Sequence, residues 1–378
     1  MPFLIPVLAL AIFAQGTSEF MLAGLLLPLS SDLGVEPAQA GLLTSAFAVG
    51  MVVGAPAVAV FGARWRPRRT LVLLLLAFIV AHAVAAVSTS FWVLLATRVV
   101  AALANAGFLA IALSTVRGIV SPVQTTRAVA TLLAGTTLAT IVGVPAGALL
   151  ASLLGWRSTF WGVVLLCIPA VVGLLLDRTL GRVAPAPRVR VRTELAELRR
   201  RVVLVPVILA VLVNAGTFGV FTFLGVIGTE GGVAESWVPA LLAAFGVGAF
   251  VGVSATARWA AHRERTWVAA GALSSTALWL LLAFGAESAS VVFAGASLGG
   301  MLSFAVGSAL ISRIVREATG APVLGGAYAT VALNLGAIAG PVSAAFAYSF
   351  TGVQGIVLTA AVLTAAAASL AVLLKTSP

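Results

Sequence analysis

Residues 177–201 read DRTLGRVAPAPRVRVRTELAELRRR, a polar stretch that contains eight arginines and the turn-forming segment Pro185-Ala186-Pro187. The chain as a whole has the opposite character, because 61% of its 378 residues are hydrophobic and only 9% are charged. A soluble domain has about 25% charged residues, so this composition excludes an ordinary soluble fold. Six apolar segments lie on each side of the polar stretch. We therefore predict three parts: residues 1–176, a basic linker at 177–201, and residues 202–378.

The apolar segments are about 20 residues long or longer, which is the length of an α-helix that crosses about 30 Å of hydrocarbon. The first segment contains Glu19 and has no basic residue before it, so we expect a retained helix and not a signal peptide. The sequence predicts an all-α membrane protein of twelve transmembrane helices, near residues 4–28, 39–63, 70–89, 92–114, 128–152, 158–176, 203–228, 237–258, 267–285, 289–311, 322–349 and 354–374.

The net charge of +11 is distributed asymmetrically between the predicted loops. All the lysines and arginines of the loops except Arg157 fall on one side, whereas the other side carries acidic residues such as Asp32 and Glu36. By the positive-inside rule, both termini and the linker are predicted to be cytoplasmic, in a multi-pass protein of the cell inner membrane. The basic charge is thus explained by topology and does not predict a nucleic-acid partner.

Residues that could perform enzyme chemistry are few and scattered. Cys167 is the only cysteine and lies in an apolar segment, His262 lies in a basic loop, and His82 is isolated in the third predicted helix. Such a set forms neither a metal cluster nor a recognisable catalytic group, so we predict no enzyme, no metal and no cofactor. For His82 we expect a packing role, with a proton relay as the alternative. A channel or a non-transporting receptor is a further alternative.

Three features of the first half recur in the second half at a nearly constant spacing. They are Ala63-Arg64-Trp65 with Ala257-Arg258-Trp259, Phe108 and Arg117 with Phe304 and Arg313, and Gly143 with Gly340. Each pair falls at the same point of the corresponding predicted helix. The recurrence predicts two six-helix bundles that are parallel repeats about an axis along the membrane normal, with the substrate site at their interface.

Two ionisable residues lie well inside predicted helices: Glu19 in the first and Arg98 in the fourth. A charged residue at the centre of a membrane helix costs about 2.5–3.5 kcal/mol on insertion scales, so both are candidates for a functional site. Gln15 lies one turn before Glu19 on the same face of the helix. The predicted depths of Glu19 and Arg98 differ by roughly 5 Å, which long side chains can bridge.

Glu19 and Arg98 together predict a proton switch. Burial among apolar groups disfavours an ionised carboxylate, whereas a nearby guanidinium favours it. Glu19 would therefore lose its proton when Arg98 approaches, and regain it when substrate or a helix shift separates the two groups. The alternative is a static ion pair that holds the first and fourth helices together.

Several further segments carry a family resemblance. They are Gln15-Gly-Thr-Ser-Glu19-Phe-Met, Thr44-Ser-Ala-Phe, Ala102-Leu-Ala-Asn105-Ala-Gly107-Phe108, Gly143-Val-Pro145-Ala-Gly147, Gly155-Trp156-Arg157, Ser303-Phe304 and Gly326-Ala-Tyr328-Ala-Thr330. With Arg98, these residues resemble the drug:proton antiporter branch of the major facilitator superfamily, and within it the chloramphenicol exporters. The resemblance covers nearly the whole chain.

The resemblance extends unevenly to the motifs of the first four helices. Arg98 matches a helix-four arginine that the family uses in proton transfer, although alanines replace the Gln and Gly expected after it. The motif between the second and third helices keeps Gly54, Arg68 and Arg69 but lacks its aspartate, since Ala63 or Arg64 stands there. Its salt-bridge latch is therefore not expected, and we assign these arginines mainly to topology.

The antiporter motif of the fifth helix is present as Gly143, Pro145 and Gly147. Pro145 is predicted to kink this helix and to free a backbone carbonyl, which would provide a pivot for rocking. Gly340 and Pro341 stand at the corresponding place in the eleventh helix.

The resemblance implies proton-coupled efflux of a small amphiphilic antibiotic, foremost chloramphenicol, by alternating access. It implies a monomer in the lipid bilayer that is driven by the proton gradient and needs no cofactor. The alternative is an exporter of the same fold for another drug or a sugar. A neutral aromatic ligand fits a cavity with aromatic walls and a few polar groups. The candidates for that cavity are Gln15, Asn105, Asn214, Phe218, Phe221, Tyr328 and Asn334.

Overall fold

The computed structural model describes residues 3–62, 66–120, 122–177, 191–259, 264–285, 288–321 and 324–373, and within these residues it contains helices and no β-strand. The predicted all-α fold is thereby confirmed. The predictions that concern Arg64, residues 185–187 and His262 fall outside the described residues.

The helices of the first half follow the predicted apolar segments. They are α1 (Leu4–Phe20), α2 (Leu22–Leu33), α3 (Pro37–Phe61), α4 (Pro67–Val87), α5 (Phe91–Ile119), α6 (Pro122–Leu138), the π-helical turn η2 (Ala139–Gly143), α7 (Val144–Leu154) and α8 (Trp156–Leu176). Proline occupies the first turn of α3 and of α4, where its missing N–H has no helical partner to lose. A short helix, α9 (Val191–Glu197), belongs to the predicted linker.

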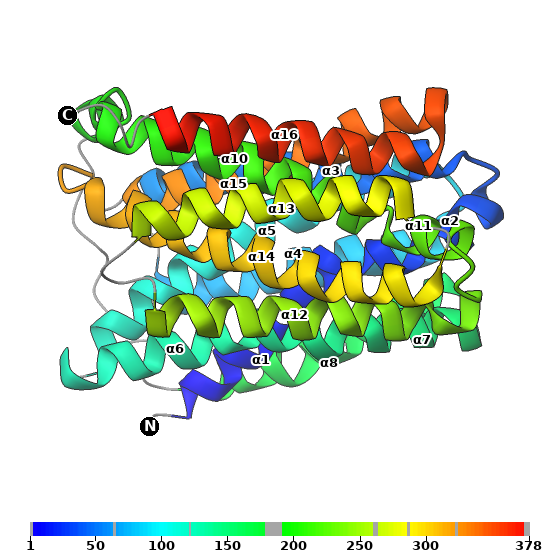
Figure 1. The fold of residues 1–378 in the computed structure, drawn as a ribbon. Helices are drawn as coiled ribbons and strands as arrows, with labels where there is room; N and C mark the ends of the chain where they lie inside the picture. The colour runs from blue at the N-terminus through cyan, green and yellow to red at the C-terminus, as the bar shows by residue number, and fades with distance from the viewer. Residues whose placement is uncertain are drawn as a thin grey trace.

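The second half repeats this order of elements. It consists of α10 (Arg201–Thr222), α11 (Leu224–Glu230), the 3-10 turn η4 (Glu235–Trp237), α12 (Val238–Trp259), α13 (Glu264–Gly285), α14 (Ala289–Glu317), α15 (Leu324–Thr351) and α16 (Val353–Leu373). The long helices lie side by side along one axis (Figure 1). Among the described residues, 11 helices are long and apolar enough to cross a membrane, and the bent pair α1–α2 brings the number to 12. The predicted number of spans is thus confirmed.

The first predicted span is not one continuous helix. It is bent by 50° between α1 and α2, directly after Glu19 and Phe20. At the bend, the Gly24 N–H bonds to the Met21 carbonyl at 2.9 Å, a shorter-range bond than the i→i−4 bond of an α-helix. The span that begins with α10 is likewise interrupted, at Phe223, before α11. Both interruptions leave backbone groups near the break without their regular helical partners.

The helix lengths and turns of the two halves correspond. Helices α5 and α14 each have 29 residues, and α8 and α16 each have 21. Glycines with positive φ lie at corresponding turns of the two halves. Gly34 and Gly232 follow the first span of each half, and Gly155 and Gly352 precede the last span. Only glycine adopts this backbone conformation without strain, so the same turns are specified in both halves.

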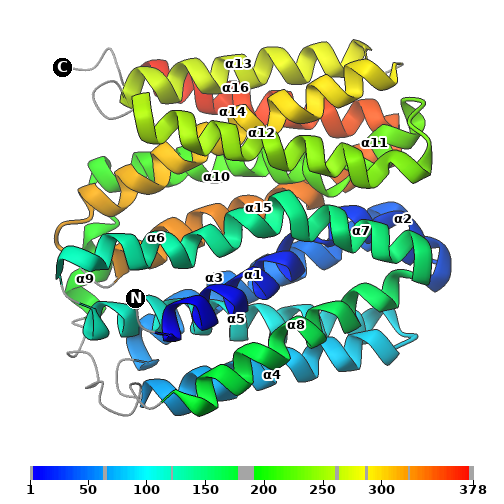
Figure 2. The ribbon, with the colours of Figure 1, turned by 90° about the horizontal axis from the view of Figure 1, so that it is seen from below.

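The two bundles meet most clearly at one end of the molecule. We call the end that holds α9 the linker end and the other the far end, where α2, α7 and α11 gather (Figure 2). There, Gly24 lies against Ala148 and Leu242, and Gly225 lies against the Ala23 carbonyl. Nearer the middle, the Ser45 hydroxyl of α3 donates to the Ile338 carbonyl of α15 at 3.2 Å.

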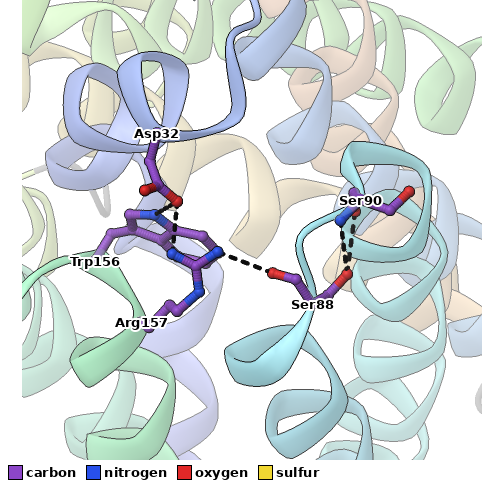
Figure 3. A network of polar contacts seen from close by, with 5 residues as sticks. All are labelled: Asp32, Ser88, Ser90, Trp156 and Arg157. Atoms are coloured by element: carbon purple, nitrogen blue, oxygen red, sulfur yellow. Dashed lines mark hydrogen bonds and ion pairs between the residues drawn. The ribbon is translucent and has the colours of Figure 1, made fainter.

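A polar network ties together three connections of the first half at the far end (Figure 3). Asp32 Oδ2 accepts hydrogen bonds from Trp156 Nε1 at 3.0 Å and from Arg157 Nη1 at 2.5 Å. Arg157 Nη2 also donates to the Ser88 carbonyl at 3.2 Å. Arg157 is the basic residue that departs from the charge pattern of the loops, and its ion pair with Asp32 neutralises it locally.

The helix α9 packs on the start of α15 at the linker end. The Glu194 carboxylate accepts a hydrogen bond from the Leu324 N–H at 2.8 Å, and the Tyr328 hydroxyl donates to the Glu194 carbonyl. A carboxylate at a helix N-terminus satisfies a free N–H and the positive end of the helix dipole. Part of the predicted linker is therefore fixed to the second half.

Glycines allow α12 and α14 to approach closely. A Cβ atom on Gly248 or Gly252 would overlap the Ser297 or the Met301 carbonyl, and one on Gly300 would overlap the Phe245 carbonyl. Such small-residue contacts are the usual basis of helix association in lipid.

The packing of α12 against α14 gives the first prediction. Gly300→Ala should lower the free energy of unfolding by about 1–3 kcal/mol, because the added methyl group must displace backbone. Gly307→Ala in the same helix is the matched control, because open space surrounds Gly307. Thermal unfolding in detergent should show a reduced midpoint for Gly300→Ala alone. Equal midpoints for the two variants would contradict the close approach.

Candidate functional site

Glu19 lies in the last turn of α1, immediately before the bend. Its carboxylate is half-buried, and Oε2 accepts a hydrogen bond from Asn105 Nδ2 of α5 at 3.4 Å. Asn105 Nδ2 also contacts the Met51 sulfur of α3 at 3.6 Å. The structure thus brings together Glu19, a predicted proton-coupling residue, and Asn105, a predicted substrate-binding residue.

Arg98 lies beside Glu19 but binds its neighbour. Its guanidinium donates from Nη1 to Ser18 Oγ and from Nη2 to the Ser18 carbonyl, both at 2.9 Å. It also lies 4.3 Å from the centre of the Phe47 ring, and the side chain is 1% exposed. Within the described residues Arg98 makes no ion pair with Glu19. The structure therefore contains the separated arrangement of the two groups, and not the static ion pair.

The Ser18 carbonyl belongs to the last turn of α1, just before the bend at which the regular run of helical hydrogen bonds ends. Arg98 supplies a donor and a positive charge at this helix end, and both stabilise the end of a helix. The buried guanidinium and the bend in the first span therefore support each other.

Ser18 is also bonded to His82, from α4. The distance between Ser18 Oγ and His82 Nε2 is 2.6 Å, and His82 Nδ1 lies 2.8 Å from the Phe78 carbonyl. The imidazole packs between the rings of Phe78 and Phe160, at centroid distances of 4.1 Å and 5.8 Å. His82 is thus part of the polar group around Arg98, which its isolated place in the sequence did not indicate.

Gln15 is completely buried one turn before Glu19, and neither atom of its amide has a hydrogen-bond partner in the structure. A buried amide without partners is unfavourable by about 1–3 kcal/mol for each unsatisfied group. Such a group is a reasonable place for a bound ligand or water to complete the hydrogen bonds.

Aromatic side chains from both bundles meet next to Glu19. The Phe20 ring lies 6.0 Å from that of Phe218 and 6.2 Å from that of Phe221, and Phe221 packs on Phe245 at 4.7 Å. Phe304 of α14 continues the cluster beyond Phe245, at 6.2 Å. We call these five rings the aromatic cluster. It places the predicted residues Phe218 and Phe221 against Phe20, the residue that follows Glu19.

Three other predicted substrate residues use their polar groups elsewhere. Asn214 Nδ2 donates to the Leu333 carbonyl at 2.6 Å, and Asn334 Nδ2 donates to the Thr330 carbonyl at 2.9 Å. The Tyr328 hydroxyl is bonded to α9, as described above. The structure does not bring these polar groups to Glu19, because backbone carbonyls of the second half and of the linker already bind them.

The motif glycines lie at helix crossings. Gly54 packs on Leu103 and Ala106 of α5, Gly147 on Thr159 of α8, and Gly340 on the Ala215 carbonyl of α10. Gly143 lies against Thr17 of α1, so that the fifth span touches the first span two residues before Glu19. These four glycines therefore serve the approach of backbones.

The helix break at Pro145 takes a specific form. The π-helical turn η2 immediately precedes the first turn of α7, where Pro145 lies. In this turn the Val144 N–H bonds to the Ala139 carbonyl, an i→i−5 bond. A π-turn accommodates a proline that cannot donate to the usual carbonyl. Pro341 lies inside α15 without a π-turn.

The motif arginines lie at the linker end. The Arg68 guanidinium donates to the Leu175 carbonyl at the end of α8, whereas Arg69 is exposed. Within the described part of the chain, neither arginine is hydrogen-bonded to Glu19 or Arg98. Their position fits the assignment to topology.

An apolar cavity lies inside the second bundle and not beside Glu19. Its lining residues include Val220, Phe245, Trp279 and Val292. Phe245 separates this cavity from the Phe221 side of the aromatic cluster. The predicted amphiphilic cavity at the interface of the halves remains a prediction.

Sequence reasoning did not single out Ser18, Phe20 or Phe245, and it gave His82 a packing role. Ser18 and Phe20 flank Glu19 in the chain, so the polar run of α1 was an available signal for them. The partnership of Ser18 with His82 joins residues of different helices and had no local signature.

Known proteins resemble this chain along its length. The Major Facilitator Superfamily matches residues 8–320. A chloramphenicol resistance protein of Streptomyces lividans is 48% identical over 350 residues, which cover 91% of this chain and 89% of that protein. The inner membrane transport protein YdhP of Escherichia coli (strain K12) is 30% identical over 93% of this chain and 92% of its own length.

A solved structure shows the same fold. It is the crystal structure of a bacterial homologue of the human lysosomal transporter Spinster, in an inward-facing and unoccupied conformation. Its TM-score is 0.79 at 15% sequence identity, over 99% of this chain and 97% of that protein.

Proposed function

The chain belongs to the Major Facilitator Superfamily, and on this basis we propose that it exports chloramphenicol from the cell in exchange for protons. The observation that carries the proposal is the 48% identity with the Streptomyces resistance protein over nearly the full length of both chains. The chain is a transporter and not an enzyme. We further propose that it acts as a monomer in the lipid bilayer, without a cofactor.

We propose that the linker end is cytoplasmic and the far end faces outward. The basic loops support this orientation through the positive-inside rule. The contacts of Gly24 and Gly225 then close the outer end of the transporter in this structure. Residues 1–176 and 202–378 are proposed to rock against each other about the contact of α3 with α15.

The substrate is proposed to bind between Glu19, Gln15 and the aromatic cluster. Chloramphenicol is neutral and carries an aromatic ring with hydroxyl and amide groups. The unpartnered amide of Gln15 offers both a donor and an acceptor, and the rings of Phe20, Phe218 and Phe221 offer apolar contact. The polar and apolar surfaces of such a ligand are thereby matched from both bundles.

Glu19 is proposed to carry the proton. It is the acid inside the first span, it accepts a hydrogen bond from Asn105, and the neighbouring Ser18 is bonded to Arg98. A substrate that shields Glu19 from water favours the neutral carboxyl group. A substrate that donates a hydrogen bond to the carboxylate competes with its proton. In either case, substrate and proton share one site.

The second prediction tests the substrate. Expression in a host that lacks its own drug pumps should lower the steady-state accumulation of radiolabelled chloramphenicol several-fold, and a protonophore should restore it. Glu19→Gln expressed to the same level is the inactive control. Unchanged accumulation with well-folded protein would remove the phenicol assignment and direct attention to another drug or a sugar.

The third prediction tests the orientation. Single cysteines are introduced at Thr193 in α9 and at Glu235 near α12, both of which are exposed. The native Cys167 is buried and is replaced by alanine. A membrane-impermeant maleimide should label Glu235→Cys on intact spheroplasts, and Thr193→Cys only after permeabilisation. The reverse pattern would invert the topology.

The fourth prediction tests the proton site. Glu19→Gln keeps the size of the side chain but cannot titrate, so substrate-induced proton release from detergent-solubilised protein should disappear. Arg98→Ala removes a charge that favours ionised Glu19, so the pH optimum of transport should move upward. Arg98→Lys should restore part of the wild-type profile, because it keeps the charge without the planar fork of donors. Undiminished release from Glu19→Gln would place the proton site elsewhere.

A further inference from the structure

The hydrogen bonds around Ser18 have a fixed direction. The Phe78 carbonyl can only accept, so His82 Nδ1 carries the hydrogen of that contact. The guanidinium of Arg98 can only donate, so Ser18 Oγ accepts from it. The Ser18 hydroxyl hydrogen is then free for His82 Nε2, which accepts it at 2.6 Å. A single chain of donors therefore leads from Arg98 through Ser18 and His82 to Phe78.

This chain requires the neutral form of His82. A proton on Nε2 would turn that nitrogen into a donor, and Ser18 Oγ would then face donors from both His82 and Arg98. It would also add a second positive charge next to a buried guanidinium. The acid near this pair is Glu19, which lies beside Arg98 and is bonded to Asn105, whereas the rings of Phe78 and Phe160 that pack on the imidazole carry no charge.

Ser18 and Glu19 are adjacent, and each offers acceptors that the same guanidinium can use. In this structure both terminal nitrogens of Arg98 are bound to Ser18, and Glu19 is bound to Asn105 instead. Arg98 Nε has no partner although it is buried. The guanidinium is therefore well held at Ser18 by two of its five N–H donors, and the Nε–H is among those left for another arrangement.

We propose that His82 and Ser18 are positioning residues for Arg98, which together hold its guanidinium away from Glu19 in this conformation. His82 acts by orienting the Ser18 hydroxyl so that its lone pairs face Arg98. The second position of Arg98 is the Glu19 carboxylate, reached when the bend at the end of α1 rearranges. The inference rests on the proposed proton coupling and adds to it the device that selects between the two positions.

The experiment measures chloramphenicol transport against pH in proteoliposomes for Ser18→Ala and His82→Leu. Loss of the Ser18 hydroxyl leaves the Ser18 carbonyl to hold Arg98, so the guanidinium should move toward Glu19, where an opposite charge favours the ionised carboxylate by about one pH unit or more. The pH optimum of transport should accordingly move to lower pH in both variants. This is opposite to the upward shift expected for Arg98→Ala.

Epistasis separates positioning from a structural role. In an Arg98→Ala background, adding His82→Leu should cause no further shift, because no guanidinium remains to be positioned. His82→Gln should restore part of the wild-type profile, since its amide oxygen can accept from Ser18. Ser275→Ala is the matched control: its buried hydroxyl donates to the Gly271 carbonyl of the same helix, α13, and its removal should leave the pH optimum unchanged.

Two outcomes would overturn the inference. One is an unshifted pH optimum in folded Ser18→Ala and His82→Leu; the other is an equal shift with and without Arg98. If His82→Leu does not fold, Ser18→Ala and His82→Gln decide the matter.

Failure of the proposed function is recognised separately, because Glu19→Gln would then keep pH-dependent transport. When Glu19→Gln abolishes it and the His82 and Ser18 variants show no shift, only the positioning role is wrong.

Discussion

A guanidinium buried in hydrocarbon is the constraint on which the first bundle depends. The five N–H donors of Arg98 are shielded from water. Each donor that lacks an acceptor lowers the free energy of unfolding. The end of α1 provides two acceptors on one residue, Ser18, because the helix stops there and its carbonyl is open. The break in the first span, the position of Glu19 and the contact with α4 all follow from how this one charge is accommodated.

The rest of the architecture keeps helices close while leaving them able to move. Glycines at the crossings of α12 with α14 and of α10 with α15 bring backbones into contact, so that packing and not hydrophobic collapse holds each bundle together. Between the bundles the contacts are of another kind, with aromatic rings near Glu19 and small residues at the far end. The exception is α3, which packs on α15 as closely as helices pack within a bundle, and this contact is the proposed pivot.

The sequence was sufficient for the features that depend on composition and spacing. Long apolar segments predicted the spans, and the cost of burying charge selected Glu19 and Arg98. It was insufficient where partners come from different helices. Ser18 meets His82 across 64 residues, and Asn214 turns to the Leu333 carbonyl across 119, and neither pairing has a local pattern. Tyr328 has the residue type of a ligand contact but lies where α9 docks.

The two halves share one plan, yet their polar groups have separate uses. In the first half an acid, a guanidinium and an imidazole lie together at the end of α1. In the second half Asn214 of α10 is hydrogen-bonded to the backbone of α15. One half therefore holds the buried acid and guanidinium, and the other holds four of the five rings of the aromatic cluster. Under the proposed function, this division separates two kinds of adaptation: changes among Phe218, Phe221 and Phe245 would alter which substrate is carried and would leave the proposed proton site unchanged.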